Sequence, residues 1–294
     1  MTARIVLLRT LFFGLLLVFA ASCEEEVELD LATDDPKVSI DARLSSNVDN
    51  PAFPACFVMV TRSTDYYTPL EVPFIRDAVI TLTDDTGQLD TLEYITLDTL
   101  GPEFGFPVTS EEIGVYLSTD FVAAPGRQYT LQVRVGDQIY EATEPMREKL
   151  PLDSLTYEYK DIPPVYDPGY YFTLHADEPQ GTGNFYLIQF YLNDTLQNAP
   201  DDIQLADDEF VDGNYIRAEL FRPFESGDTI DVEFHHITQS MYDFQVAHLD
   251  IVQGSGTPFS APPANPPSNF SNGALGLFWV SAPVTRRIII PEED

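Results

Sequence analysis

Strict alternation of apolar and polar residues restricts the fold of this chain more than any other feature. It occurs in residues 38–44, 77–84 and 129–135. A period of two places every second side chain on the same face of a β-sheet, so each segment predicts a half-buried strand. Turn-forming pairs such as Pro125-Gly126 and Gly136-Asp137 separate the segments. The pattern therefore predicts an all-β fold.

The same pattern divides the chain into two predicted β domains. Residues 37–148 fit an immunoglobulin-like or transthyretin-like β-sandwich. Residues 149–294 predict a second β-sandwich-like domain, in which the nearly continuous apolar run 184–193 indicates a central strand buried on both faces. One short helix is expected near 240–253, where Ser240 and Asp243 match a capping box. A Pro-rich loop is expected over 254–272.

The N-terminus indicates export and lipid anchoring. Residues 1–22 combine Arg4 and Arg9 with an uncharged apolar run, which is typical of a signal peptide and too short to span a bilayer. Small residues then precede Cys23, as in a lipobox, although Ala20 stands where Leu is usual. We expect Cys23 to be acylated and to anchor the protein to a membrane. The alternative is a plain signal peptide cleaved nearby.

An acidic tether over residues 23–36 follows the cysteine. Its position resembles the surface-export signal of Bacteroidetes-type outer-membrane lipoproteins, which implies lipid anchoring at the outer membrane with exposure at the cell surface. The alternative is a solvated linker in a chain that is acidic throughout.

The charge balance excludes nucleic acid as a partner. The chain has 48 acidic and 15 basic residues, for a net charge of −33. Binding to nucleic acid depends on cationic side chains that displace counterions from phosphates, and few are present. The remaining cysteine, Cys56, lies in an apolar run and predicts a buried small hydrophobic residue.

Few residues suggest a reaction, and we expect no enzyme. The four histidines lack metal-ligand spacing, and His235 and His236 should point to opposite faces of a strand. No cofactor is expected apart from a calcium ion at Asp207, Asp208 and Asp212, because Ca²⁺ binds clustered carboxylates. The alternative there is an acidic turn between strands.

Two segments are candidates for ligand contact. Tyr170 and Tyr171 follow the Pro163-Pro164 loop, although aromatic residues on strands more often pack in cores. Asn269, Asn272 and Gly273 could form a ligand loop. The alternative is that Gly273 and Gly276 shape the start of a strand through positive φ or close backbone approach.

Three landmarks in the second half resemble a known family. They are the acidic turn at 208–213, the segment GDTIDVEFHHITQSMYDF at 227–244 and the segment NFSNGALGLFW at 269–279. Together with the lipobox and the tether, they are similar to the outer-membrane lipoprotein family of domain of unknown function 4249. The resemblance implies association with a TonB-dependent outer-membrane receptor and identifies no catalytic residue.

These observations predict a surface-exposed lipoprotein that acts as a non-catalytic binding or accessory component of a TonB-dependent nutrient uptake system. Two alternatives remain open. One is a structural or adhesive protein of the cell envelope, and the other is a hydrolase whose site has no familiar motif.

Overall fold

The computed structural model describes residues 35–49, 54–64, 73–96, 113–118, 120–254 and 265–292. The predicted signal peptide 1–22, Cys23 and the tether up to residue 34 lie outside these residues, as do residues 255–264 of the predicted Pro-rich loop. The chain from Pro36 to Asp294 makes up a unit of its own. The secondary structure of this unit is mostly β, as the alternating pattern predicts.

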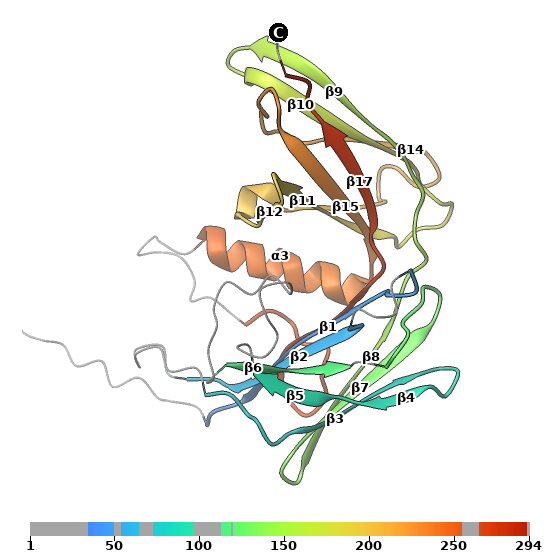
Figure 1. Cartoon of the computed structure of the whole chain (residues 1–294), viewed down its shortest axis with the longest axis vertical. Coiled ribbons are helices and arrows are strands. Elements are labelled where there is room, and N and C mark those ends of the chain that lie inside the picture. The colour runs from blue at the N-terminus through green and yellow to red at the C-terminus, as the bar shows by residue number, and fades with distance from the viewer. Residues whose placement is uncertain are drawn as a thin grey trace, which may run out of the picture. The chain divides into compact units, whose positions relative to one another are not determined.

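Two sheets form the first sandwich (Figure 1). Sheet A has the strand order β16 (Leu275–Ser281), β1 (Val38–Ser45), β2 (Cys56–Arg62), β6 (Gly114–Ser118) and β5 (Glu93–Thr96). Sheet B has the order β4 (Leu89–Thr91), β3 (Val79–Asp84), β7 (Gln128–Val135) and β8 (Gln138–Pro145).

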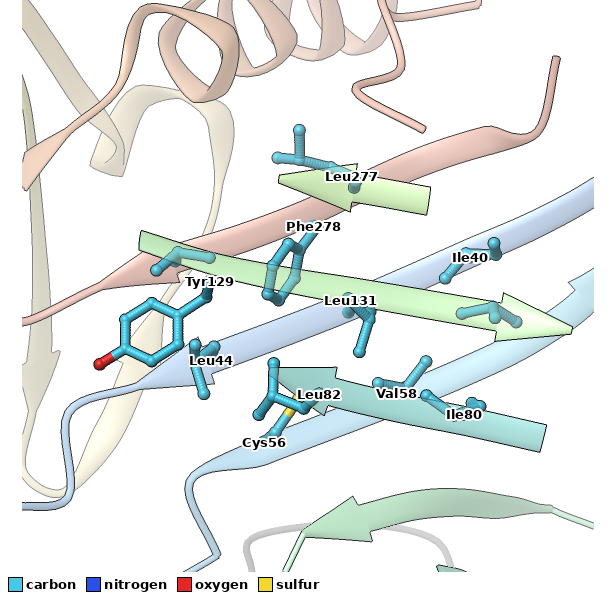
Figure 2. Close-up of a cluster of buried hydrophobic side chains, with 14 of the residues drawn as sticks. Ile40, Leu44, Cys56, Val58, Ile80, Leu82, Tyr129, Leu131, Leu277 and Phe278 are labelled. Atoms are coloured by element: carbon cyan, nitrogen blue, oxygen red, sulfur yellow. The ribbon is translucent and has the colours of Figure 1, made fainter. Parts of the chain in front are cut away.

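The predicted alternation builds the core between sheets A and B. Figure 2 shows Ile40 and Leu44 of β1 with Leu82 of β3 and Leu131 of β7, and all four are fully buried. Burying each such side chain stabilises the fold by roughly 1.5–3 kcal/mol. Cys56 lies in the same core, and burial raises the pKa of its thiol, so it behaves as the small hydrophobic residue that the sequence predicts.

Two further sheets enclose a second core. Sheet C has the order β14 (Tyr215–Glu219), β10 (Tyr166–Asp177) and β9 (Leu152–Ile162). Sheet D has the order β12 (Thr195–Gln197), β11 (Phe185–Leu192), β15 (Thr229–Ile237) and β17 (Val284–Ile289), with β13 (Gln204–Asp207) also paired to β11. Phe172, Phe190 and Phe224 meet at ring-centroid distances of 5.3–6.3 Å within this core.

Sheet D is buried on both faces over part of its width. In β11, Tyr186, Ile188 and Phe190 belong to the second core, whereas Leu187 belongs to the first. The expected central strand over 184–193 is therefore confirmed. Its continuous apolar sequence follows from having a hydrophobic core on each side.

The connection between the two β regions was not expected. Strand β16, which the sequence places in the second domain, runs parallel to β1 and completes sheet A. Parallel pairing needs a long crossover, and here the rest of the first sandwich and the second β region lie between the two strands along the chain. At the contact, Gly276 adopts φ +98°, and a Cβ atom there would clash with the carbonyl oxygen of Ile40.

The predicted helix is confirmed as α3 (Gln239–Gly254), and a short 3-10 turn, η2, covers Pro200–Asp202. Met241 is the buried residue of α3, and the Tyr242 ring lies 5.0 Å from the Phe185 ring of β11. The prediction that Ser240 caps the helix is wrong. The helix begins at Gln239, and the Ser240 hydroxyl donates to the Glu144 carboxylate over 2.5 Å. In the described part of the chain, α3 included, no helix is both long and apolar enough to cross a membrane.

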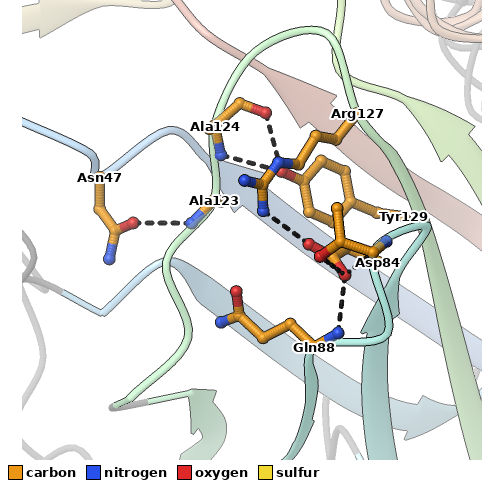
Figure 3. Close-up of polar contacts among 8 residues, drawn as sticks. Asn47, Asp84, Gln88, Ala123, Ala124, Arg127 and Tyr129 are labelled. Atoms are coloured by element: carbon orange, nitrogen blue, oxygen red, sulfur yellow. Dashed lines mark hydrogen bonds and ion pairs between the residues drawn. The ribbon is translucent and has the colours of Figure 1, made fainter.

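Buried polar groups hold the loops of the first sandwich (Figure 3). The Asp84 carboxylate accepts hydrogen bonds from the backbone N–H groups of Thr86 and Gln88 and pairs with Arg127 at 2.8 Å. Burial alone would raise the pKa of Asp84, but these donors outweigh it and hold the pKa below its ordinary value. The buried Tyr129 hydroxyl and the Asn47 amide bond the backbone at Ala124 and Ala123.

Replacing Gly276 tests the parallel contact. We expect Gly276→Ala to lower the free energy of unfolding by at least about 3 kcal/mol, because the new methyl group meets backbone that cannot move aside. Gly136→Ala is the matched control, since Gly136 also has positive φ but has open space around it, so its cost should stay near about 1 kcal/mol. Urea denaturation of both variants measures the difference, and equal costs would contradict the close approach.

Acid denaturation tests the Asp84 network. Because the folded-state pKa of Asp84 lies below its unfolded value, its contribution is present above about pH 4 and is lost as pH falls through the folded pKa. We expect Asp84→Asn to cost about 2–3 kcal/mol at neutral pH. The cost should shrink as pH falls from about 4 through the folded pKa of Asp84, measured as unfolding midpoints across pH. A cost that does not change with pH would rule out this role for the carboxylate.

Candidate functional site

The hairpin of β9 and β10 carries two exposed tyrosines, Tyr157 and Tyr159, whose rings both pack against the half-buried Tyr170. The two strands pair antiparallel, from Leu152 opposite Ala176 to Ile162 opposite Tyr166. A hydrogen bond from the Val165 N–H to the Ile162 carbonyl closes the turn between them. Figure 1 shows them side by side as a long hairpin.

One face of the hairpin presents tyrosines. Tyr157 and Tyr159 are 41% and 54% exposed, and their rings pack edge-on against Tyr170 at centroid distances of 5.9 and 5.3 Å. This face continues into the second core through Phe172, which pairs with Tyr157 across the strands. The tyrosines thus extend a hydrophobic core surface beyond the part that sheet D covers.

The opposite face holds an ion pair among aromatic rings. Lys160 and Glu219 form a close salt bridge, and the Lys160 ammonium lies 4.2 Å from the centre of the Tyr166 ring. The Tyr166 hydroxyl donates to Glu219 over 2.7 Å, and its ring stacks on the exposed Phe221. Burial opposes ionisation of Glu219, but the bonds from Lys160 and Tyr166 lower its pKa.

The predicted ligand residues Tyr170 and Tyr171 do not share a site. As neighbours on β10 they point to opposite faces, and Tyr171 is 4% exposed with its hydroxyl bonded to the Asp167 carbonyl. The exposed tyrosines of the adjoining strand, Tyr157 and Tyr159, were missed. The alternation of Leu155, Tyr157 and Tyr159 with polar residues could have indicated them.

The predicted ligand-loop residues Asn269, Asn272 and Gly273 hold strand edges. The Asn269 amide donates to the Phe278 carbonyl and accepts from the Phe278 N–H, so it occupies the outer edge of β16. It also donates to the buried Glu144 carboxylate over 2.9 Å. Asn272 donates to the Ile139 carbonyl of β8, and the left-handed φ of 56° and 72° at Asn272 and Gly273 makes the turn into β16.

The calcium candidates bind backbone N–H groups. Asp208 accepts from Gly183 and Asn184, Asp212 accepts from Gly181, and Asp207 accepts from Glu209, all at 2.7–3.1 Å. Burial works to raise the pKa of Asp208, but the bonds from Asn184 and Gly183 prevail and lower it. Among the described residues, no three His, Cys, Asp or Glu side chains are grouped to hold a metal ion. Calcium binding stays a prediction.

The histidine pair separates as the sequence predicts. His236 lies 3.2 Å from the Asn184 amide and 3.3 Å from the Glu148 carbonyl, and burial lowers its pKa. On the other face, His235 lies between the Ser281 hydroxyl at 3.2 Å and the Glu233 carboxylate at 3.4 Å.

The row of Glu233, His235 and Ser281 has the residue types of a hydrolase triad. Ser281, however, is 1% exposed, and its hydroxyl accepts a hydrogen bond from the Trp279 indole over 2.9 Å. Nucleophilic catalysis needs a hydroxyl that a substrate can reach. The arrangement therefore describes a packed polar contact between β15 and β16.

A shallow depression of about 430 Å³ lies over the outer face of sheet B. Its lining includes Thr81, Thr83, Thr130 and Gln132. These hydroxyl and amide groups are typical of a hydrated sheet surface rather than of an apolar ligand pocket.

Replacing Asn269 tests whether the segment 269–273 has a structural role or binds a ligand. We expect Asn269→Ala to lower the free energy of unfolding by about 2–3 kcal/mol, because it leaves Glu144 and both backbone groups of Phe278 without this partner. Asn272→Gly, which keeps the positive φ and removes one exposed contact, should cost less than about 1 kcal/mol. An unchanged thermal midpoint for Asn269→Ala would favour the ligand loop instead.

Comparison with known proteins identifies a family. No curated protein matches the chain. The family described as Domain of unknown function (DUF4249) matches residues 24–287, which include the edge-holding residues Asn269 and Asn272 and the hairpin of β9 and β10. The chain therefore belongs to the DUF4249 family.

Proposed function

We propose that this protein is a surface-exposed outer-membrane lipoprotein that acts as a non-catalytic binding or accessory component of a TonB-dependent nutrient uptake system. Cys23 would carry the lipid anchor, and the acidic tether would direct the protein to the cell surface. The partner would be a TonB-dependent outer-membrane receptor. The proposal requires no cofactor and assigns no catalytic residue.

The exposed tyrosine face of the β9–β10 hairpin is the observation that carries this proposal. Tyr157, Tyr159 and Tyr170 form one connected aromatic surface at the margin of the second core. Tyrosine is enriched at protein interfaces, because its ring buries a large area while its hydroxyl remains satisfied by water or a partner. Exposed aromatic patches mark interaction sites more often than isolated exposed residues do.

The strong negative charge supports a protein partner over a lipid surface. A body with a net charge of −33 is repelled by anionic lipid headgroups. The same charge speeds association with a receptor surface that is locally basic. Membrane attachment would then depend on the anchor at Cys23, and recognition would depend on the body.

A structural or adhesive role in the cell envelope is the second candidate. The several packed sheets of the body support it, since β-sandwiches often serve as spacers and contact surfaces. The two candidates differ in their partner, because adhesion needs no receptor in the same membrane.

Capture of the tagged protein from its native outer membrane in mild detergent tests the proposal. We expect a TonB-dependent β-barrel to co-purify in stoichiometric amount, identified by mass spectrometry. Tyr157→Ser combined with Tyr159→Ser should weaken the capture roughly thirtyfold, as expected when interface aromatics that contribute about 2 kcal/mol are lost.

Two variants serve as controls. Leu89→Ser removes a more exposed apolar side chain from β4 and should leave capture unchanged. Cys23→Ser removes the acylation site and should release the protein from the membrane fraction. Recovery of the wild-type protein alone would contradict the receptor partner. Loss of cell adhesion with normal nutrient uptake in a deletion strain would then favour the adhesive role.

A further inference from the structure

Strand β9 forms an edge of sheet C and is longer than the other edge strands in the described residues, with 11 residues. Among the described strands, it pairs only with β10, on one side. None of the described residues makes a backbone hydrogen bond to its other side between Leu155 and Tyr159. Unpaired edges of this length attract further strands, and proteins usually cover them.

The hydrogen bonds of β10 show in which direction the backbone N–H and C=O groups of β9 point. The N–H and carbonyl of Tyr170 both bond Phe224, on the side away from β9, and the Phe172 carbonyl likewise accepts from Leu220. Tyr170 faces Tyr159, and Phe172 faces Tyr157. These are non-hydrogen-bonded pairs of an antiparallel ladder, in which the two residues direct their backbone N–H and C=O groups away from each other. The N–H and C=O groups of Tyr157 and Tyr159 therefore point outward.

The neighbouring edges of the first sandwich are covered by side chains or turns. Asn269 occupies both backbone groups of Phe278 on β16. On β8, the Glu141 carbonyl accepts from the Ser271 N–H, and the Glu141 N–H donates to the Ser271 hydroxyl. β17 packs beside part of β9, but no described side chain or turn hydrogen-bonds the outer backbone of β9 between Leu155 and Tyr159. The one basic side chain of β9, Lys160, is held on the opposite face by Glu219.

We propose that the outer edge of β9 is a docking site for an extended, basic segment of a partner protein, which adds to sheet C as a further antiparallel or parallel strand. The inference rests on the proposed binding function and names how the partner is held. Backbone hydrogen bonds to Tyr157 and Tyr159 would supply affinity, and alternate side chains of the incoming strand would supply specificity.

The two faces of β9 define the chemistry of this segment. On one face, the Tyr157 and Tyr159 rings would pack against apolar side chains, as cross-strand aromatic pairs with β-branched residues do. On the other face, Glu158 would lie beside the incoming strand. Lysine or arginine opposite Glu158 gains a favourable pair, whereas a like charge there is destabilising. The segment should therefore alternate apolar and basic residues.

Charge argues against the other possible occupants. A second copy of this chain would bring Glu158 and a body of net charge −33 to the same edge. The chain's own tether over residues 24–34 carries a run of acidic residues and would be repelled in the same way. A basic segment of a different protein is the occupant that this edge favours.

Binding of synthetic octapeptides to the full chain in detergent tests the inference. The probe is a fluorescent peptide that alternates valine with lysine and threonine, followed by fluorescence anisotropy. One matched peptide carries glutamate in place of lysine, and another carries N-methyl groups on alternate residues. We expect the basic peptide to bind, salt to weaken it, and both matched peptides to bind at least about tenfold more weakly.

Two substitutions at one position separate the backbone from the ring. Tyr157→Pro and Tyr157→Thr both remove the ring, but only proline removes the outward N–H. Since that N–H makes no bond within the sheet, proline is compatible with this edge position. We expect Tyr157→Pro to bind the basic peptide roughly tenfold more weakly than Tyr157→Thr, with similar circular dichroism spectra.

Several outcomes would overturn the inference. These are equal binding by Tyr157→Pro and Tyr157→Thr, equal binding of the N-methylated peptide, and binding of the acidic peptide at least as tight as that of the basic one. The N-methylated peptide keeps the test decisive should Tyr157→Pro fail to fold. Dimers detected by light scattering and lost in Tyr157→Pro would assign the edge to a second copy and would also overturn it.

The peptide assay and the membrane capture can fail separately. Edge-dependent peptide binding without a co-purified β-barrel would uphold the docking edge and reject the proposed receptor. A captured β-barrel that binds Tyr157→Pro as well as Tyr157→Thr would uphold the receptor and reject the edge.

Discussion

The parallel pairing of β16 with β1 is the constraint on which the rest of the structure depends. It joins residues near the two ends of the described chain, so everything between them must form one long crossover. The contact is possible only because Gly276 lets its backbone approach Ile40 without a side chain. Once β16 is in place, α3 and the turn at residues 269–274 lie beside sheet A, and β15 contacts β16 through His235 and Ser281.

Side-chain amides and carboxylates serve mainly to satisfy backbone groups in this protein. Asn269 replaces a neighbouring strand at Phe278, Asp84 holds the β3–β4 turn, and Asp208 holds the loop before β11. Asn and Asp are also the residue types that sequence patterns associate with ligand and metal binding, so a sequence pattern does not separate the two roles. A chain rich in carboxylates can use several of them in this way, because the N–H groups that converge on each carboxylate offset the cost of its burial and gain a partner themselves.

The outer edge of β9 differs from the edges of the first sandwich in how its backbone groups are bonded. The first sandwich closes its edges at β8 and β16 with the family segment around Asn269, whereas no described residue hydrogen-bonds the outer backbone of β9 at Tyr157 and Tyr159, beside the aromatic surface. Retaining an open edge carries a risk of unwanted association, which the high negative charge reduces through repulsion between copies. An unpaired β9 edge on a strongly acidic protein is therefore compatible with selective docking of a basic partner segment.

The sequence by itself determined the all-β class, the strands with period-two alternation, the central strand β11, the helix near residue 240 and the opposite orientation of His235 and His236. Each of these depends on local periodicity, which a single segment carries. Only the tertiary structure decided that β16 completes sheet A, that Tyr170 and Tyr171 serve different faces and that Tyr157 lies on an open edge. These features depend on which strands become neighbours, and pairing between distant segments is set by the packing of the whole core rather than by the residues of either strand.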